Sequence, residues 1–146
     1  MHARATTRFI GVTSGWSYRR AGRAYLAVAT ARLLTTLPPA HIRTALRIAR
    51  CSAAPADVAQ AQAARDAVVA VSTRCAGQGC LQRSLATTLL CRLGGTWPTW
   101  CTGVRTVPFR AHAWVEVDEV PVGEPTPPGY YTPTLTVPCR SRPERA

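Results

Sequence analysis

One cysteine in this chain stands where a nucleophilic thiol would be placed. Cys80 follows Gly-Gln-Gly and heads the segment CLQRSLATTLLCRL, in which leucines recur at helical spacing. A thiol in the first turn of a helix faces unpaired backbone N–H groups and the positive end of the helix dipole, and both favour the reactive thiolate. Such a nucleophile also needs a base within hydrogen-bond reach and a third group that orients the base.

The best-placed base is His112. The chain has three histidines; His2 lies in the N-terminal segment, and His41 follows two prolines at the start of a short predicted helix. His112 lies in AHAWVEVDEV, whose alternation of period two predicts a strand with His112, Trp114 and Glu116 on one face. A lone histidine in a strand is commonly structural, and the helix-initiating cysteine favours the catalytic interpretation.

Glu124 is the predicted orienting group. The chain has no asparagine, which leaves a carboxylate as the natural choice. Glu116 is four positions from His112 on the same strand, about 13 Å away at about 3.3 Å per residue, and cannot reach the imidazole. Glu124 reaches it if a three-residue turn at 117–119 brings the chain back beside the strand. A two-residue turn would pair His112 with Pro125 and direct Glu124 to the other face.

The six cysteines have other possible uses, namely zinc binding, disulfides and core packing. Structural zinc usually needs close-spaced CxxC pairs, which Cys75, Cys80, Cys91 and Cys101 do not form. Disulfides would need an export signal. The twin arginines of YRRAGRAYLAVATARLLTTLPPA faintly resemble one, but further arginines interrupt the apolar run, which is too short to span a bilayer. We therefore expect a cytoplasmic protein with reduced cysteines, no metal and no cofactor.

The charge is strongly positive and uneven. The net charge is +11, all 18 basic residues are arginine, and the first fifty positions hold nine arginines and no acidic residue. This basic N-terminal part could attract an acidic peptide, a nucleic acid or a partner protein. Alternatively, it could be a solvated surface that is rich in arginine because a GC-rich genome favours arginine codons. No recognition helix, zinc finger or RNA-binding motif is present, so we expect no nucleic-acid partner.

Hydrophobic periodicity predicts helices first and strands afterwards. We expect a flexible tail at 1–20, followed by four helices. The helices are expected at about 23–37, at a short segment with Ile42, Leu46 and Ile48, at a longer segment opened by Pro55 with Asp57 in its first turn, and from Cys80 to the stop at Gly94-Gly95. Beyond them, TWPTWCTGV and AHAWVEVDEV predict strands, and an apolar patch at 130–137 predicts an edge strand.

This order of elements predicts an α+β fold in one domain. The length of 146 residues is sufficient for one hydrophobic core. We place the domain at 21–146, with a helical part at 21–75 and a catalytic core at 76–138.

Three segments, GCLQRSLATTLLCRLGG, WCTGVRTVPFRAHAWVEVD and PVGEP, together resemble the leader peptidases of lasso-peptide biosynthesis in their stand-alone actinobacterial form. These enzymes are cysteine peptidases of the transglutaminase-like superfamily. The resemblance runs from about Gly77 to Pro125 and continues more weakly over the helices before it. It implies a transglutaminase-like, papain-like fold in which N-terminal helices and a cysteine-headed core helix pack on a small antiparallel sheet. Cys80 matches the nucleophile and His112 the base, and Glu124 stands where many relatives have aspartate.

The resemblance also implies a reaction and its partners. Such enzymes remove the leader from a ribosomally made precursor peptide, at the leader–core junction, before macrolactam closure. A separate leader-recognition protein and an ATP-dependent lasso cyclase are the further candidate partners. In the cleavage itself, backbone N–H groups at the helix start could stabilise the oxyanion, with the side chain of Gln78 as an additional donor. Two alternatives stay open: acyl transfer to an amine on the same scaffold, and a non-catalytic peptide-binding module with an inert Cys80.

Overall fold

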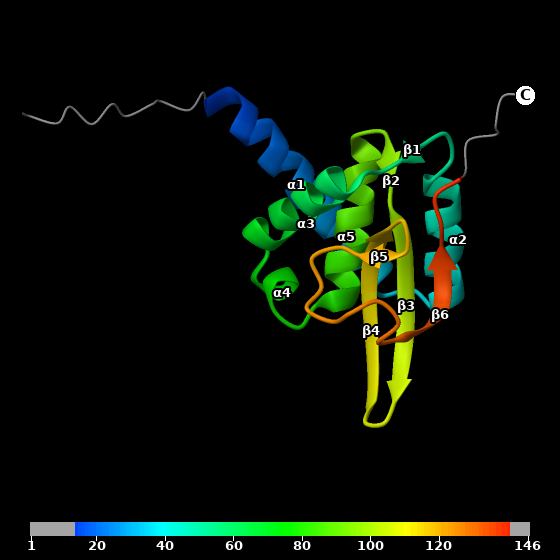
Figure 1. Ribbon diagram of the computed structural model, residues 1–146. Helices are drawn as coiled ribbons and strands as arrows, with labels where there is room; N and C mark the ends of the chain where they lie inside the picture. Colours follow the sequence, from blue (N-terminus) through cyan, green and yellow to red (C-terminus); the bar gives the residue numbers. More distant parts are fainter. Residues whose placement is uncertain (1–13, 141–146) are drawn as a thin grey trace, which may run out of the picture.

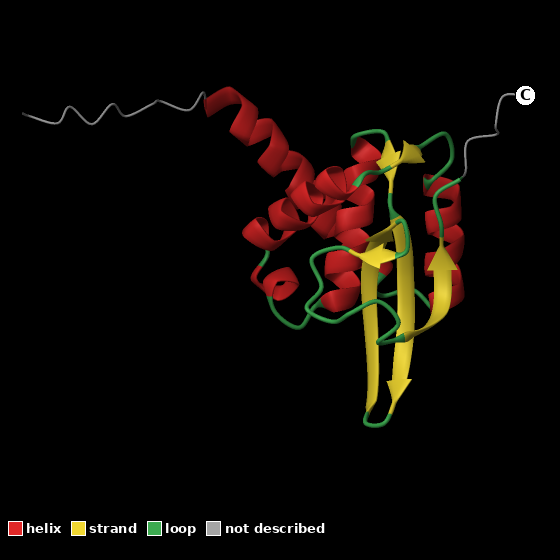
Figure 2. Ribbon diagram, in the orientation of Figure 1, coloured by secondary structure: helices red, strands yellow, loops and turns green. Residues whose placement is uncertain are grey.

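The computed structural model describes residues 14–140, which form a layer of helices and a small antiparallel sheet (Figures 1 and 2). The fold is 49% helical and 24% strand, which confirms the predicted α+β class. In chain order the elements are α1 (Ser14–Leu34), α2 (Pro39–Ala49), β1 (Ala54–Pro55), α3 (Val58–Val71), α4 (Thr73–Ala76), α5 (Cys80–Leu93), β2 (Thr96–Trp97), β3 (Thr99–Thr106), β4 (Phe109–Val117), β5 (Val120–Pro121) and β6 (Thr132–Val137).

Helix α5 is enclosed by the rest of the fold, since it packs against α1, α3 and the sheet. Eight of its 14 residues are buried, and five of these are polar. The hydroxyls of Thr87 and Thr88 donate to the carbonyls of Arg83 and Ser84, and the Ser84 hydroxyl accepts from the Trp100 indole at 3.1 Å. Leaving such a group unpaired in the core would cost about 1–3 kcal/mol. The predicted helix is confirmed, and these local hydrogen bonds let its polar side also lie in the core.

The four-stranded sheet has the order β5-β4-β3-β6 with every neighbouring pair antiparallel. The predicted alternation in β4 is confirmed, because Ala113, Val115 and Val117 are all buried. Trp100 of β3 pairs with Val115 on one side and with Val137 of β6 on the other, and all three belong to the main core. The expected edge strand at 130–137 is therefore present as β6.

The first helix begins earlier than expected. Helix α1 starts at Ser14, so the tail predicted at 1–20 is wrong for residues 14–20, while 1–13 lie outside the described residues. The start of α1 projects away from the other helices (Figure 1), and Tyr18, Arg19 and Arg20 are exposed. A helical turn that packs on nothing needs no apolar periodicity, which is why the sequence pattern placed the start near residue 23.

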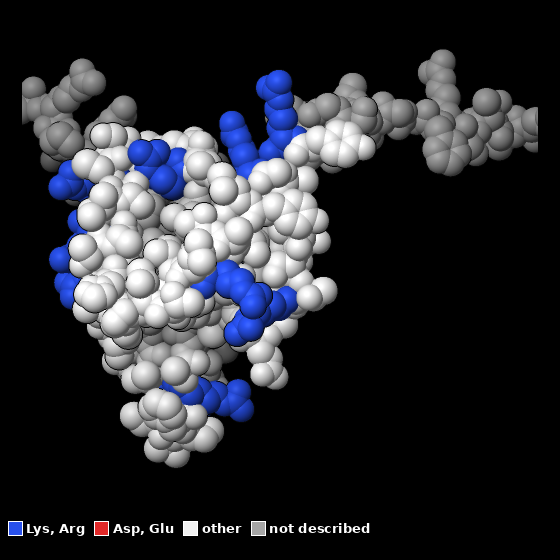
Figure 3. All heavy atoms as spheres, turned by 180° about the vertical axis from the view of Figure 1, so that it is seen from behind, with Lys and Arg blue, Asp and Glu red and all other residues white. Residues whose placement is uncertain are grey.

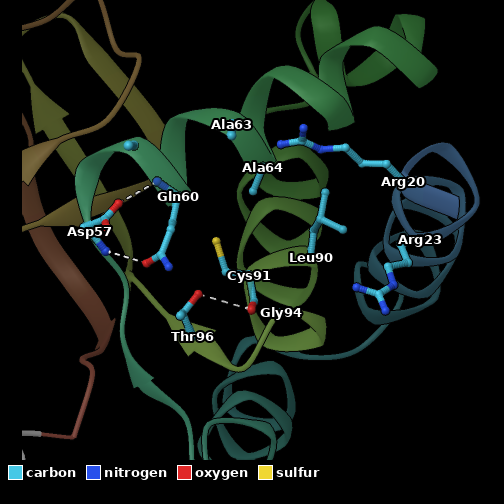
Figure 4. Close-up of a pocket in the computed structure, with 11 residues that line it drawn as sticks. Arg20, Arg23, Asp57, Gln60, Ala63, Ala64, Leu90, Cys91, Gly94 and Thr96 are labelled. Carbon is cyan, nitrogen blue, oxygen red and sulfur yellow. Dashed lines mark hydrogen bonds between the residues drawn. The ribbon is translucent and has the colours of Figure 1, made fainter. Parts of the chain in front are cut away.

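The third helix begins later than expected. Pro55 lies in β1, paired in parallel with Trp97, instead of opening the helix. The N-cap is Asp57, whose carboxylate accepts from the Gln60 N–H at 2.7 Å, while the Gln60 side chain accepts from the Asp57 N–H at 3.0 Å (Figure 4). This reciprocal capping box satisfies two backbone donors and fixes Val58 as the first helical residue.

Candidate active site

Cys80 is the first residue of α5, and the chain reaches it through a tight turn. Gly79 has φ −79° and ψ 53°, and the Cys80 N–H donates to the Gln78 carbonyl at 2.9 Å, which closes an inverse γ-turn. A Cβ atom on Gly79 would lie 2.7 Å from the carbonyl oxygen of Arg74. The glycine before the cysteine is therefore required by close backbone approach.

The thiol of Cys80 lies half-buried against β4. A hydrogen bond with His112 is the main cause that lowers the pKa of this thiol, and burial opposes it. A backbone hydrogen bond from Ala113 and the positive charges of His112 and Arg83 lower the pKa further. The charge of Arg83 is held in place because its guanidinium donates to the carbonyls of Cys75 and Gly77 at 2.9 and 3.0 Å. The site therefore favours the thiolate.

His112 joins the thiol to a carboxylate. The hydrogen bonds with Cys80 and with Glu124 raise the pKa of His112 to about 9, against the effect of burial. The Nε2 atom lies 2.8 Å from Oε2 of Glu124, which leaves Nδ1 for the sulfur. The lowered pKa of the thiol and the raised pKa of the imidazole both favour a thiolate–imidazolium pair over a neutral thiol and imidazole.

The turn that precedes Glu124 has two residues, so the predicted three-residue turn is wrong. Val117 pairs with Val120 across the turn, and Asp118 and Glu119 form its corner with φ values of 50° and 65°. Both residues adopt the left-handed conformation that such a turn demands, although neither is glycine. The longer turn was expected because, in a regular ladder, it is the connection that places Glu124 opposite His112.

Glu124 reaches His112 because the ladder breaks just before it. Val122 still follows the two-residue register, since its N–H donates to the Val115 carbonyl at 2.9 Å. Continued for two more residues, that register would direct Glu124 away from His112. Gly123 instead adopts φ 66°, a conformation open to glycine, and redirects the chain so that the carboxylate meets the imidazole.

Arg65 of α3 is a site residue that the sequence did not indicate. Its Nη2 atom lies 4.0 Å from Oε1 of Glu124, whose side chain is only 6% exposed. Its side chain also lies against the backbone of Gly123, where an added Cβ would come within 2.7 Å of the Arg65 Cδ. Arg65 thus packs over the residue that turns the chain and places a positive charge beside the orienting carboxylate. In a helix of a chain with 18 basic residues, no spacing distinguished it.

Tyr131 is a second residue that sequence reasoning missed. Its ring stacks on His112 with centroids 5.0 Å apart and lies 5.9 Å from the ring of Trp114. Trp114 is buried, and its indole donates to Glu116 at 3.0 Å. Trp114 therefore serves as core and also as the wall behind the imidazole. Tyr131 comes from the proline-rich segment, which the pattern identified only as an apolar patch.

Two hollows meet at Cys80. One, of about 520 Å³, lies between α2, the start of α5 and the sheet, and is lined by His112 and by apolar side chains such as Ile42 and Trp100. The other, of about 480 Å³, is also lined by Cys80 and lies between the end of α1, α4 and the start of α5. Gln78 is exposed and lines this second hollow. A chain passing over the thiol could therefore place side chains in both hollows.

Another hollow, of about 430 Å³, lies between α1, α3 and the far end of α5 (Figure 4). Its cysteine is Cys91, whose pKa burial raises to about 12. Burial likewise raises the pKa of Cys101 to about 12. Both thiols are protonated at neutral pH and are poor nucleophiles, which agrees with their prediction as core residues.

A helix-initiating thiol paired with a strand histidine, which a carboxylate orients in turn, is the arrangement that thiol-dependent acyl transfer requires. Residues 24–136 match the family model of the transglutaminase-like superfamily. Because this match covers well over half of the chain, the protein belongs to that superfamily. Its members typically act as cysteine-dependent hydrolases or transferases and include cysteine peptidases.

The searches of curated proteins and of solved structures gave no match. Among the described residues, no helix is long and apolar enough to cross a membrane.

We predict that iodoacetamide at pH 6 modifies half-buried Cys80 faster than exposed Cys51. The reason is the lowered pKa of Cys80, since each pKa unit changes the thiolate fraction about tenfold. His112→Ala removes the main cause of that shift and should slow the labelling of Cys80. Mass spectrometry of the digested protein measures both rates, with Cys51→Ser as the control. Equal labelling of Cys80 and Cys51, or unchanged labelling in His112→Ala, would contradict this assignment.

We predict that the His112 ring titrates near pH 9 in an NMR titration, and at lower pH in Glu124→Gln, because the carboxylate raises this pKa. The folded pKa exceeds the unfolded value of 6.5, so the stability from this group is full below pH 6.5 and is lost as pH rises through about 9. The free energy of unfolding should therefore differ more between wild type and Glu124→Gln at pH 6 than at pH 10. Asp118→Asn, which removes a carboxylate from the turn, is the control. An unchanged midpoint in Glu124→Gln would show that Glu124 does not act on the imidazole.

Proposed function

We propose that the protein is a cysteine peptidase that removes the leader from a ribosomally made lasso precursor before macrolactam closure. The observation that carries the peptidase part is the hydrogen-bonded series Cys80, His112 and Glu124 within a transglutaminase-like fold. The lasso part is supported by the resemblance of the segments between Gly77 and Pro125 to leader peptidases. The reaction belongs in the cytoplasm, a reducing compartment, because the nucleophile must remain a free thiol.

The mechanism uses the thiolate–imidazolium pair. The Cys80 sulfur attacks the scissile carbonyl, and the resulting tetrahedral oxyanion collapses when His112 donates its proton to the leaving amine of the core peptide. His112, now neutral, takes a proton from water as the water attacks the thioester, and collapse of this second tetrahedral intermediate releases the leader as a carboxylic acid and restores the thiolate–imidazolium pair. Glu124 stabilises the imidazolium and holds Nδ1 toward the sulfur, which makes it a positioning residue.

The oxyanion would be bound at the start of α5. The Cys80 N–H donates to the Gln78 carbonyl in the resting structure, so it becomes a donor to substrate when the γ-turn opens. The side chain of Gln78 lines the adjoining hollow and can supply a second donor. Both donors belong to the turn at residues 78–80, so the scissile carbonyl would point toward this turn.

Acyl transfer to an amine is the second candidate function, and the superfamily's inclusion of transferases favours it. It shares the thioester intermediate with peptide hydrolysis and differs only in whether an amine or water attacks it. A binding module with an inert cysteine is less well supported, because the surroundings of Cys80 lower the pKa of its thiol.

We propose that the leader-recognition protein docks on the outer face of α1. This helix is apolar on two sides: Ala24, Ala27 and Ala31 are buried against the fold, while large side chains on the opposite side are exposed. The exposed ones are Tyr18, Tyr25, Leu26 and Leu33. Arg19 lies at the edge of this outer face, and no acidic residue occurs before Asp57, so the complementary partner surface is an apolar groove with an acidic rim. The lasso cyclase would receive the released core after this step.

We predict that Cys80→Ala and His112→Ala each lower leader removal to below about a thousandth of the wild-type rate, because they remove the nucleophile and the base. Glu124→Gln should lose less. The assay incubates each variant with the leader-recognition protein and the precursor peptide encoded by a neighbouring gene, and follows cleavage by mass spectrometry. Cys51→Ala is the control. Undiminished cleavage by Cys80→Ala would remove the nucleophile assignment. If added glycinamide converts most of the product to its amide, acyl transfer is the better description.

We predict that the double variant Leu26→Asp/Leu33→Asp weakens binding to the leader-recognition protein by about tenfold or more, because it puts charge into an apolar contact. Ile48→Asp is the matched control, since Ile48 is 70% exposed on a different helix. Isothermal titration calorimetry measures the affinity, and iodoacetamide labelling of Cys80 checks that each variant is folded. Equal affinities for the two variants would exclude this face of α1.

A further inference from the structure

We infer that the hollow beside Cys80 is a carboxylate-binding subsite, in which Arg32 and Arg74 hold an acidic side chain of the substrate close to the scissile bond. The inference rests on the proposed function and adds a specificity to it. Three observations support the inference. They are the chemistry of the hollow's lining, the character of the neighbouring apolar hollow and the distribution of charge over the molecule.

The lining of the hollow carries positive charge and hydrogen-bond donors. Arg32 comes from the last turn of α1 and Arg74 from α4, and both line the same hollow of about 480 Å³ as the candidate nucleophile. Gln78 is a further polar residue of the lining, while the hydroxyls of Thr35 and Thr36 already donate to carbonyls of α1. Arginine presents a planar fork of N–H groups that matches a carboxylate, so two arginines facing one hollow select for an anionic group.

No acidic side chain among residues 14–140 lines this hollow or forms an ion pair with Arg32 or Arg74. Arg32 and Arg74 lie in the last turns of α1 and α4, and both side chains are exposed. Arg83 adds a third positive charge near Cys80. A substrate carboxylate placed here would therefore find unshared cationic partners.

The other hollow that Cys80 lines has the opposite character. Its lining is mostly apolar, with Ile42, Trp100 and Leu135 among its residues, and apart from the candidate base His112 it includes no charged side chain. Its volume of about 520 Å³ suits one or two apolar side chains. The two hollows together describe a substrate with a carboxylate on one side of the cleaved bond and an apolar residue on the other.

The distribution of charge over the molecule would steer such a substrate. Acidic residues of the described part gather near β4 and β5, where Glu116, Asp118 and Glu119 lie. The face turned away from the view of Figure 1 presents arginines and shows no acidic side chain among its described residues (Figure 3). A potential of one sign over a face attracts oppositely charged chains and weakens with added salt.

The test uses two alkylating probes that differ by one charge, bromoacetyl-glutamate amide and bromoacetyl-glutamine amide. In each reaction the Cys80 thiolate forms a carbon–sulfur bond and bromide leaves. We expect wild type to react about tenfold faster with the glutamate probe at low salt, as one charge-assisted hydrogen-bonded contact would give. The preference should shrink as salt is added, and should fall to about one in Arg32→Gln/Arg74→Gln.

The control is Arg47→Gln/Arg140→Gln, which removes the same net charge from exposed arginines that do not line either hollow. It should keep the preference for the glutamate probe. The charge-reversed variant Arg32→Glu/Arg74→Glu should instead favour a bromoacetyl-lysine amide probe, which a merely structural role for the arginines would not produce.

The outcomes separate the subsite from the proposed function. If wild-type Cys80 reacts with the glutamine probe and shows no preference for glutamate, or if the control loses the preference as fully as the double variant, the subsite is excluded while the nucleophile stands. If Cys80 reacts with neither probe below the pH of ordinary thiols, the proposed thiol chemistry fails and the subsite fails with it.

Discussion

The structure depends on one imidazole that touches two groups delivered by different parts of the chain. His112 receives the thiol from the start of α5 and the carboxylate from the segment after β5, and each hydrogen bond raises its pKa. The orientation of the His112 ring is fixed by Tyr131 and Trp114, which stack beside it. Because the two hydrogen bonds use different ring nitrogens, charge on one partner strengthens the contact with the other. Both pKa shifts favour the proton on the imidazole over the proton on the sulfur.

The fold brings these groups together by placing a partly polar helix in its centre. Helix α5 must face the other helices and the sheet at once, so its hydroxyls bond to its own carbonyls and to the Trp100 indole. The anchoring of Arg83 to the carbonyls of Cys75 and Gly77 fixes the loop that leads into the helix. Helix α5 also packs directly on β4, so the thiol and the imidazole lie on two elements that are in contact.

The sequence was sufficient for the parts of the site that repeat with a period. The helical spacing of leucines located α5 and its first residue, and the alternation in β4 located His112 and the buried valines. Contacts made by single residues leave no periodic pattern in the sequence, so periodicity could not predict them. The contact of Glu124 with His112 depends on the φ of Gly123, and the turn before it has two residues where three were expected. Arg65 and Tyr131 reach the site through tertiary packing alone, from segments whose local pattern described only a helix and a loop.

The γ-turn before α5 determines which group accepts the hydrogen bond of the Cys80 N–H when no substrate is bound. The Cys80 N–H already donates to the Gln78 carbonyl, so the carbonyl of an incoming peptide must replace the Gln78 carbonyl as the acceptor of this hydrogen bond. Exchanging one neutral acceptor for another gains almost nothing while the substrate is intact. The exchange becomes favourable only as negative charge grows on the attacked oxygen. The γ-turn would therefore stabilise the transition state without strengthening the binding of the intact substrate.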